Sequence, residues 1–85
     1  MKLFISGGVK FYTLAEGEAY PDPHADNRYV GAYVVFPFEG KWCVQILERN
    51  TWRDLTVQHF ETDNIAFNFA YNHYVAQQEK QRNNR

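Results

Sequence analysis

The sequence predicts an α+β domain in which an antiparallel β-sheet carries one C-terminal α-helix packed on one face. Short apolar runs separated by turn residues occupy the first two thirds of the chain, which is typical of strands and hairpins. A longer segment with helical spacing of its apolar side chains follows residue 62. The length of 85 residues corresponds to one small domain, residues 1–85.

The N-terminal residues 2–14 predict a β-hairpin. Two short apolar runs lie on either side of Gly7-Gly8, and two glycines between such runs are typical of a two-residue turn. This turn gives both faces of the hairpin apolar side chains. The expected opposed pairs are Phe4 with Phe11 on one face and Leu3 with Tyr12 on the other.

Residues 15–27 have no periodicity and contain prolines and acidic residues, so we expect a loop. A loop of this length is frequently functional in a compact domain. Asp22, His24 and Asp26 are its candidate metal or acid–base residues. Two carboxylates and one histidine fall short of the four ligands of a closed zinc site. We therefore expect no metal, and a metal site or small enzyme in the acidic loop 16–27 is the second alternative.

A three-stranded meander follows, beginning with the strongest strand pattern at residues 28–38. A second alternating run covers residues 41–48, with its apolar side chains at even-numbered positions. A three-residue loop over 38–40 keeps the even-numbered apolar side chains of both strands on one face. We expect this register, because burial of one face fixes strand pairing. The expected pairs are Phe36 with Trp42, Val34 with Val44 and Ala32 with Ile46.

The third strand of the meander is expected at residues 53–59, after a turn at Asn50-Thr51. This arrangement opposes Glu48 and Arg53 as a cross-strand ion pair. The other expected pairs are Ile46 with Leu55 and Val44 with Val57.

The last element is a helix capped by Thr62 or Asp63. It is expected to run through Gln78 or a little beyond, with residues 79–85 as a frayed tail. Its apolar side chains cover a wider arc than contact with one sheet face requires. The expected sheet contacts are Ile65, Ala66, Phe69, Ala70 and His73. Three further rings, Phe67, Tyr71 and Tyr74, are expected at the edge of that contact or outside it.

Composition and motifs exclude several classes of function. Nine Lys and Arg against ten Asp and Glu argue against a surface that neutralises many phosphates. The single cysteine, Cys43, forms no internal disulfide, and no apolar run is long enough to span a membrane, so we expect a cytoplasmic protein without membrane contact. Gly7-Gly8 lacks the features of a phosphate cradle, and Cys43 sits in a strand centre away from positive charge. We therefore expect neither an enzyme nor a bound cofactor.

The seven Phe, six Tyr and two Trp fall on both faces of nearly every expected element. Tyr and Trp are enriched in protein interfaces. The sequence therefore predicts a small non-enzymatic binding or regulatory protein that uses exposed aromatic surface on a protein partner or as a homodimer. The candidate contact residues are Phe67, Tyr71, Tyr74, Tyr29 and Tyr33. In the competing interpretation the rings only build a small core, with the hairpin folded over the second sheet face.

Single-stranded nucleic acid is the first alternative ligand. Exposed Tyr29 and Tyr33 on a sheet face would stack on unpaired bases. Such platforms also need a cationic groove, and few basic residues, such as Arg28 and Lys41, lie near this face. Protein binding is therefore the favoured interpretation.

Overall fold

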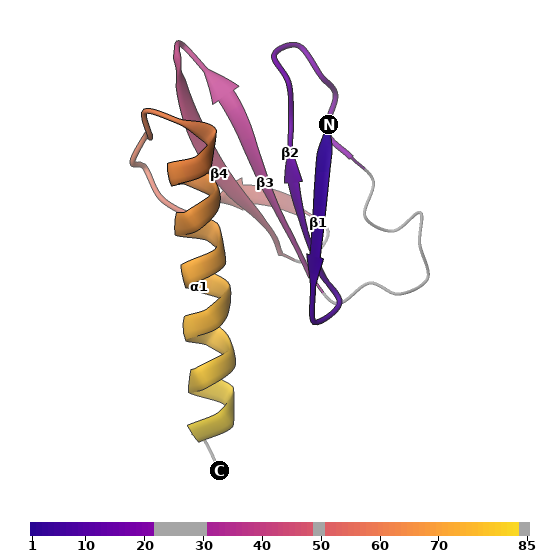
Figure 1. Cartoon of the computed structure of the whole chain (residues 1–85), viewed down its shortest axis with the longest axis vertical. Coiled ribbons are helices and arrows are strands. Elements are labelled where there is room, and N and C mark those ends of the chain that lie inside the picture. The colour runs from indigo at the N-terminus through magenta and orange to yellow at the C-terminus, as the bar shows by residue number, and fades with distance from the viewer. Residues whose placement is uncertain (22–30, 49–50, 84–85) are drawn as a thin grey trace.

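The computed structural model describes residues 1–21, 31–48 and 51–83. In these residues five strands form one sheet in the order β1-β2-β3-β4-β5, and one helix packs against it (Figure 1). The α+β class is therefore confirmed. The elements are β1 (Lys2–Ser6), β2 (Val9–Thr13), β3 (Gly31–Phe38), β4 (Lys41–Glu48), β5 (Thr51–Asp54) and α1 (Asp63–Asn83).

The sheet is mixed, so the prediction of a purely antiparallel sheet was wrong. β2 runs parallel to β3, with Val9 opposite Gly31 and Thr13 opposite Val35, while the other neighbouring strands are antiparallel. Parallel neighbours need a long connection that brings the chain back to the starting end of the strand. The segment between Thr13 and Gly31 has the length for this crossover.

The N-terminal hairpin is present, with Phe4 opposite Phe11 and Leu3 opposite Tyr12 as expected. Gly7 and Gly8 have φ angles of 59° and 83°, which a two-residue type I′ turn requires and which glycine adopts without strain. The hairpin extends the sheet sideways as its first two strands, so it does not fold over the second sheet face. This placement makes β1 an edge strand.

The pairing of β3 with β4 differs from the predicted register. Val35 lies opposite Val44, because the turn contains only Glu39 and Gly40. Both residues have positive φ angles, 51° and 79°, which define a type I′ turn and match the twist of the flanking strands. The change moves the odd-numbered side chains of β3 onto the face that α1 covers.

The pairing of β4 with β5 is also shifted, with Leu47 opposite Trp52. The strand ends at Asp54, and the chain leaves the sheet so that Val57 is 92% exposed. It returns at Phe60, whose N–H and C=O both bond to the backbone of Trp42 at 2.8 Å. The strand expected over 53–59 is therefore wrong beyond Asp54. The Glu48–Arg53 ion pair is present at 2.7 Å, on the surface and between residues that are not directly opposed.

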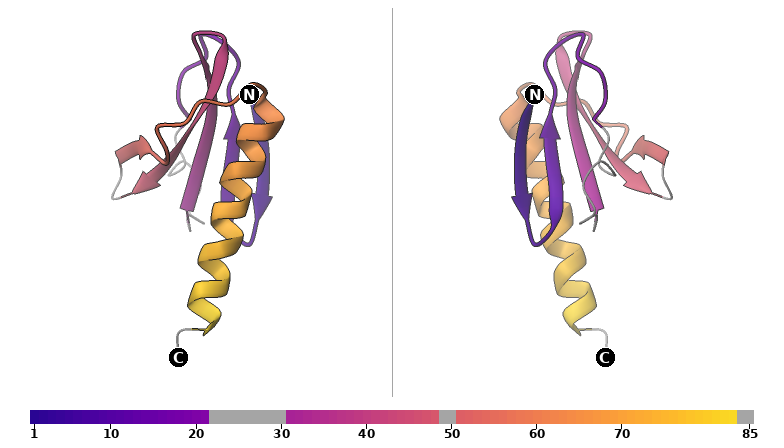
Figure 2. Two further views of the ribbon diagram at one scale, coloured as in Figure 1. Left: turned by 90° about the vertical axis from the view of Figure 1, so that its left-hand side faces the viewer. Right: turned by 90° about the vertical axis from the view of Figure 1, so that its right-hand side faces the viewer.

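The helix begins as expected, because the Thr62 Oγ1 accepts the N–H of Ile65 at 3.1 Å. It continues to Asn83, beyond the end expected near Gln78, and residues 79–83 include the helix formers Gln, Glu, Lys and Arg. The C-terminal end of α1 projects beyond the sheet (Figure 2). Within the described ranges, no helix has the length and apolar character that crossing a membrane requires.

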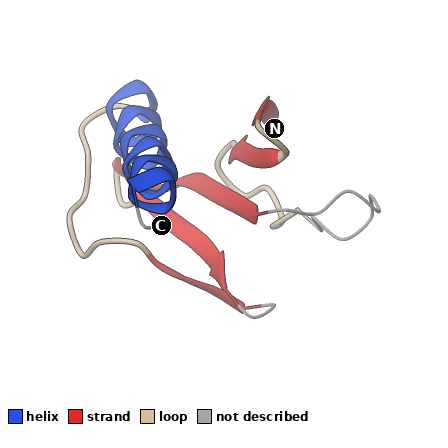
Figure 3. Ribbon diagram, turned by 90° about the horizontal axis from the view of Figure 1, so that it is seen from below, coloured by secondary structure: helices blue, strands red, loops and turns tan. Residues whose placement is uncertain are grey.

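The sheet buries side chains on both faces. Figure 3 shows α1 on one side of the sheet. On the other side Tyr20, from the segment after β2, packs against Phe36 and Trp52 and donates its hydroxyl to the Gln45 Oε1 at 2.8 Å. The core under α1 contains Val9, Phe11, Tyr33, Val35, Val44, Phe60, Ala66 and Ala70. The second core contains Tyr12, Leu14, Ala32, Val34 and Leu47, with Phe36 and Trp52 packed against it.

Candidate binding edge at strand β1

The three helix rings among the predicted contact residues lie at the edge of the contact between α1 and the sheet. Phe67, Tyr71 and Tyr74 are half-buried, and their ring centroids lie 5.6, 5.7 and 5.6 Å from that of Phe11. Their edge position agrees with the expectation from helical periodicity. Ile65, expected to contact the sheet, is instead exposed. A role of the three rings in binding stays a prediction.

Tyr33 was expected on an exposed sheet face, and that placement was wrong. The Glu39-Gly40 turn puts Tyr33 on the face under α1, where it is 5% exposed and stacks on Phe11 at 5.0 Å. A ring in this position is not available to stack on a base or to contact a partner. Tyr29 lies outside the described residues.

The hydroxyl of Tyr33 is satisfied inside the core. It forms a hydrogen bond of 2.7 Å with the Nδ1 of His73, which is half-buried on α1. Burial raises the pKa of Tyr33 to about 12, so the phenol stays protonated above pH 10, where an exposed tyrosine ionises. His73 therefore acts as the partner of a buried hydroxyl, which agrees with the general rule that buried polar groups are hydrogen-bonded.

The residues considered for metal binding or catalysis give no site in the described part of the chain. No group of His, Cys, Asp and Glu with metal-binding geometry occurs there. Asp22, His24 and Asp26 lie outside the described residues. Cys43 is buried, and burial raises the pKa of its thiol, with Asp54 adding to the rise. A reactive cysteine needs a lowered thiol pKa and access to substrate, so Cys43 has the character of a packing residue.

The outer edge of β1 carries three consecutive exposed apolar side chains. Leu3, Phe4 and Ile5 are 52%, 45% and 55% exposed, although each is a large apolar side chain. Phe4 lies on the face that carries α1, and Leu3 and Ile5 lie on the opposite face, because successive side chains of a strand alternate. In the described residues no strand pairs with the outer side of β1. The edge therefore combines free backbone groups with apolar side chains on both faces.

On the face that carries α1, the exposed edge joins the helix rings through Phe4. Its centroid lies 5.8 Å from Phe11, 5.6 Å from Phe67 and 6.1 Å from Tyr71. These four residues form one ring cluster, called the edge cluster below. Because Phe4 is about half exposed, the edge cluster continues from the core to the surface at β1.

The opposite edge of the sheet is different in character. β5 has only four residues, and two of them, Arg53 and Asp54, are charged and exposed. Short length and charge are the usual devices that keep an edge strand from pairing with another chain. In β1 the one charged side chain is Lys2, at the end of the strand. Among the described residues, the sheet therefore has one short, charged edge strand and one apolar edge strand without a neighbour on its outer side.

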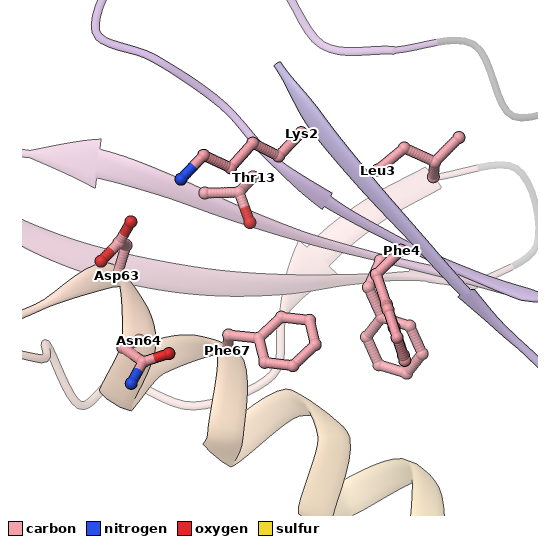
Figure 4. Close-up of a pocket in the computed structure, with 8 residues that line it drawn as sticks. Lys2, Leu3, Phe4, Thr13, Asp63, Asn64 and Phe67 are labelled. Carbon is pink, nitrogen blue, oxygen red and sulfur yellow. The ribbon is translucent and has the colours of Figure 1, made fainter.

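A shallow hollow of about 210 Å³ adjoins β1 on the helix side (Figure 4). The rings of Phe4 and Phe67 form its apolar side, and Asp63 and Asn64 at the start of α1 border it. Lys2 and Thr13 line its other side. A strand paired with β1 would direct alternate side chains to this face of the sheet.

The sequence contained part of the signal for this site. Apolar side chains on both faces of residues 2–6 are visible in the printed sequence, but the position of the strand at a sheet edge is not. Comparison of the chain with protein-family models, curated proteins and solved structures finds no significant match. The candidate site therefore depends on the geometry of the edge.

Proposed function

We propose that this chain is a small non-enzymatic binding protein that takes up an extended segment of a protein partner along the outer edge of β1. The supporting observation is an edge strand whose three central side chains are large, apolar and about half exposed. In this mode of recognition, main-chain hydrogen bonds supply affinity and contacts of alternate side chains supply specificity. A reducing cytoplasm is the proposed compartment, because the single cysteine is free.

The direction of the free backbone groups follows from the type I′ turn of the hairpin. Such a turn closes on a hydrogen-bonded pair, here Ser6 and Val9. Hydrogen-bonded and non-hydrogen-bonded pairs alternate along an antiparallel ladder. Phe4 therefore directs its N–H and C=O toward β2, and Leu3 and Ile5 direct theirs outward. An added strand would bond to Leu3 and Ile5.

The side chains around the edge suit an apolar segment. Leu3 and Ile5 would contact one side of the added strand, and Phe4 with the rest of the edge cluster would contact the other. Aromatic side chains are frequent anchors of binding energy in interfaces. This arrangement keeps the predicted roles of Phe67 and Tyr71, which lie next to Phe4 on α1.

Selection of extended peptides tests the proposal. We expect a phage-displayed library of random peptides to yield binders of the wild-type chain whose affinity falls at least about tenfold in Ile5→Pro. Proline removes the outward N–H of residue 5 while the ladder between β1 and β2 keeps its bonds, and proline is accepted on edge strands at such positions. The affinity of synthetic copies of the selected peptides, measured by titration calorimetry, gives the comparison.

Ile5→Val is the matched control, because it keeps the N–H and a β-branched apolar side chain. It should bind the same peptides within about threefold of wild type, since losing one methylene changes binding little. Circular dichroism establishes that both variants are folded. Leu3→Pro removes the other outward N–H of β1 and should weaken binding of the same peptides in the same way. Peptides that bind wild type and Ile5→Pro equally well, or a library that yields no binder, would rule out the edge as the binding site.

A further inference from the structure

The backbone and side chains at the outer edge of β1 also indicate which strand pairs with it. We infer that its occupant is β1 of a second copy of this chain, paired antiparallel about a two-fold axis that passes beside Phe4. This inference rests on the proposed function and names the partner for the same edge. Three features of β1 support it: which residues direct their N–H and C=O groups outward, how the side chains of two copies fit together, and where the single charged side chain lies.

Only alternate residues of β1 direct their N–H and C=O groups outward, and this limits the registers in which β1 can pair with itself. The outward groups belong to Leu3 and Ile5, so each must face a residue whose groups also point outward. With the axis at Phe4, Leu3 faces Ile5 of the partner subunit and Ile5 faces Leu3 of the partner subunit. This register pairs all five residues of β1, whereas axes at Leu3 or Ile5 leave part of the strand without a partner strand residue.

Side chains on both faces fit the same register. Leu3 and Ile5 of the two copies form one apolar patch across the junction of the sheets, where each is about half exposed in the single chain. The two Phe4 residues form a non-hydrogen-bonded pair, in which side chains approach most closely, with Cα atoms about 4.5 Å apart. The edge clusters of the two copies thereby become continuous.

The charge of the strand is compatible with self-pairing. Lys2 is the only charged residue of β1, and the register places it opposite Ser6 of the partner subunit. No two like charges are opposed within the paired strands. A partner strand with a lysine or arginine facing Lys2 would be disfavoured by repulsion. A five-residue strand pair is a small interface, so we expect reversible association rather than a permanent dimer.

Charges placed at the two outward positions test the dimer and its register together. In Leu3→Glu/Ile5→Glu, the two introduced carboxylates would face each other across the junction, so the dimer should be lost. In Leu3→Lys/Ile5→Glu, the introduced ammonium group would face the introduced carboxylate of the partner chain instead, so the dimer should return. The two variants differ only at position 3. Both place the carboxylate at position 5 opposite Lys10 of β2, an opposite-charge pair within the same chain.

Sedimentation equilibrium over concentrations from about 1 μM to 1 mM measures the outcome. The weight-average mass of wild type should rise from 10.1 kDa toward twice that value. Leu3→Glu/Ile5→Glu should stay monomeric throughout, and Leu3→Lys/Ile5→Glu should recover most of the wild-type association. Wild type that stays monomeric, or a doubly acidic variant that dimerises like wild type, would overturn the inference. Failure of Leu3→Lys/Ile5→Glu to recover association would overturn the register.

Cysteine pairs give a second test that leaves the apolar edge intact. Lys2→Cys and Ser6→Cys face each other across the proposed junction, so a mixture of the two should form a disulfide-linked dimer under mild oxidation. Neither variant alone should do so at the same rate, because the introduced cysteines of the two identical copies lie about four residues apart along the paired strands. Equal cross-linking in all three samples would contradict the register. A monomeric wild type whose β1 still binds selected peptides would overturn the second copy as occupant and leave the proposed function standing.

Discussion

Replacing Phe11 with alanine is expected to destabilise the fold by about 3–5 kcal/mol, the usual cost of removing a fully buried aromatic ring. Phe11 is 2% exposed and belongs to the core under α1. Its ring contacts Phe4 on β1, Tyr33 on β3 and three rings of α1. Loss of one ring therefore weakens the contacts among four elements.

The size of this effect matters because the whole domain is small. At about 0.05–0.15 kcal/mol per residue, an 85-residue chain has a stability of roughly 4–13 kcal/mol. Urea unfolding followed by circular dichroism measures the change. Phe38→Ala is the matched control, because Phe38 is an exposed ring at the end of β3, and it should lose less than about 1 kcal/mol. Similar losses in both variants would contradict the assignment of Phe11 to the buried core.

The second large effect is expected from Ala70→Leu. Ala66 and Ala70 lie one helical turn apart on α1, and neither has exposed surface. Small side chains at these positions let the helix lie close to the sheet, so a leucine at 70 must displace the helix or its neighbours. Overpacking of this kind costs about 1–3 kcal/mol. The melting temperature should fall by about 4–8 °C for each kcal/mol in a domain of this size.

Ala76→Leu is the control for this substitution, since Ala76 is exposed on the same helix. Alanine and leucine have similar helix propensities, so the melting temperature should change little. If Ala70→Leu also leaves the melting temperature unchanged, the close approach of α1 to the sheet at residue 70 is wrong.

Local patterns predicted much of the fold. Gly7-Gly8 fixed the register of the first hairpin, and Thr62 marked the start of the helix. The register of β3 with β4 was missed because apolar side chains alternate on both faces of β3, so burial of one face did not select between the two loops. The two-residue turn at Glu39-Gly40 sets the register instead. Its first residue, Glu39, adopts a positive φ angle, which is unusual for glutamate and cannot be predicted from the sequence.

The order of the strands in the sheet could not be predicted from these local sequence patterns. The parallel pairing of β2 with β3 joins residues that are far apart in the sequence, and hairpin signals report only neighbouring strands. The edge position of β1 follows from that pairing. Helical periodicity placed Phe67, Tyr71 and Tyr74 at the edge of the helix–sheet contact or outside it, but did not bring them to β1. Leu3 and Ile5 became candidates only when the sheet order was known.

Amide hydrogen exchange along β1 tests the central claim most directly. The N–H groups of Leu3 and Ile5 should exchange rapidly in dilute protein and become protected as the protein concentration rises or as a selected peptide is added. The N–H of Phe4 should be protected under all of these conditions, because it faces β2. Rapid exchange at Leu3 and Ile5 at every concentration and with every peptide would contradict pairing at this edge.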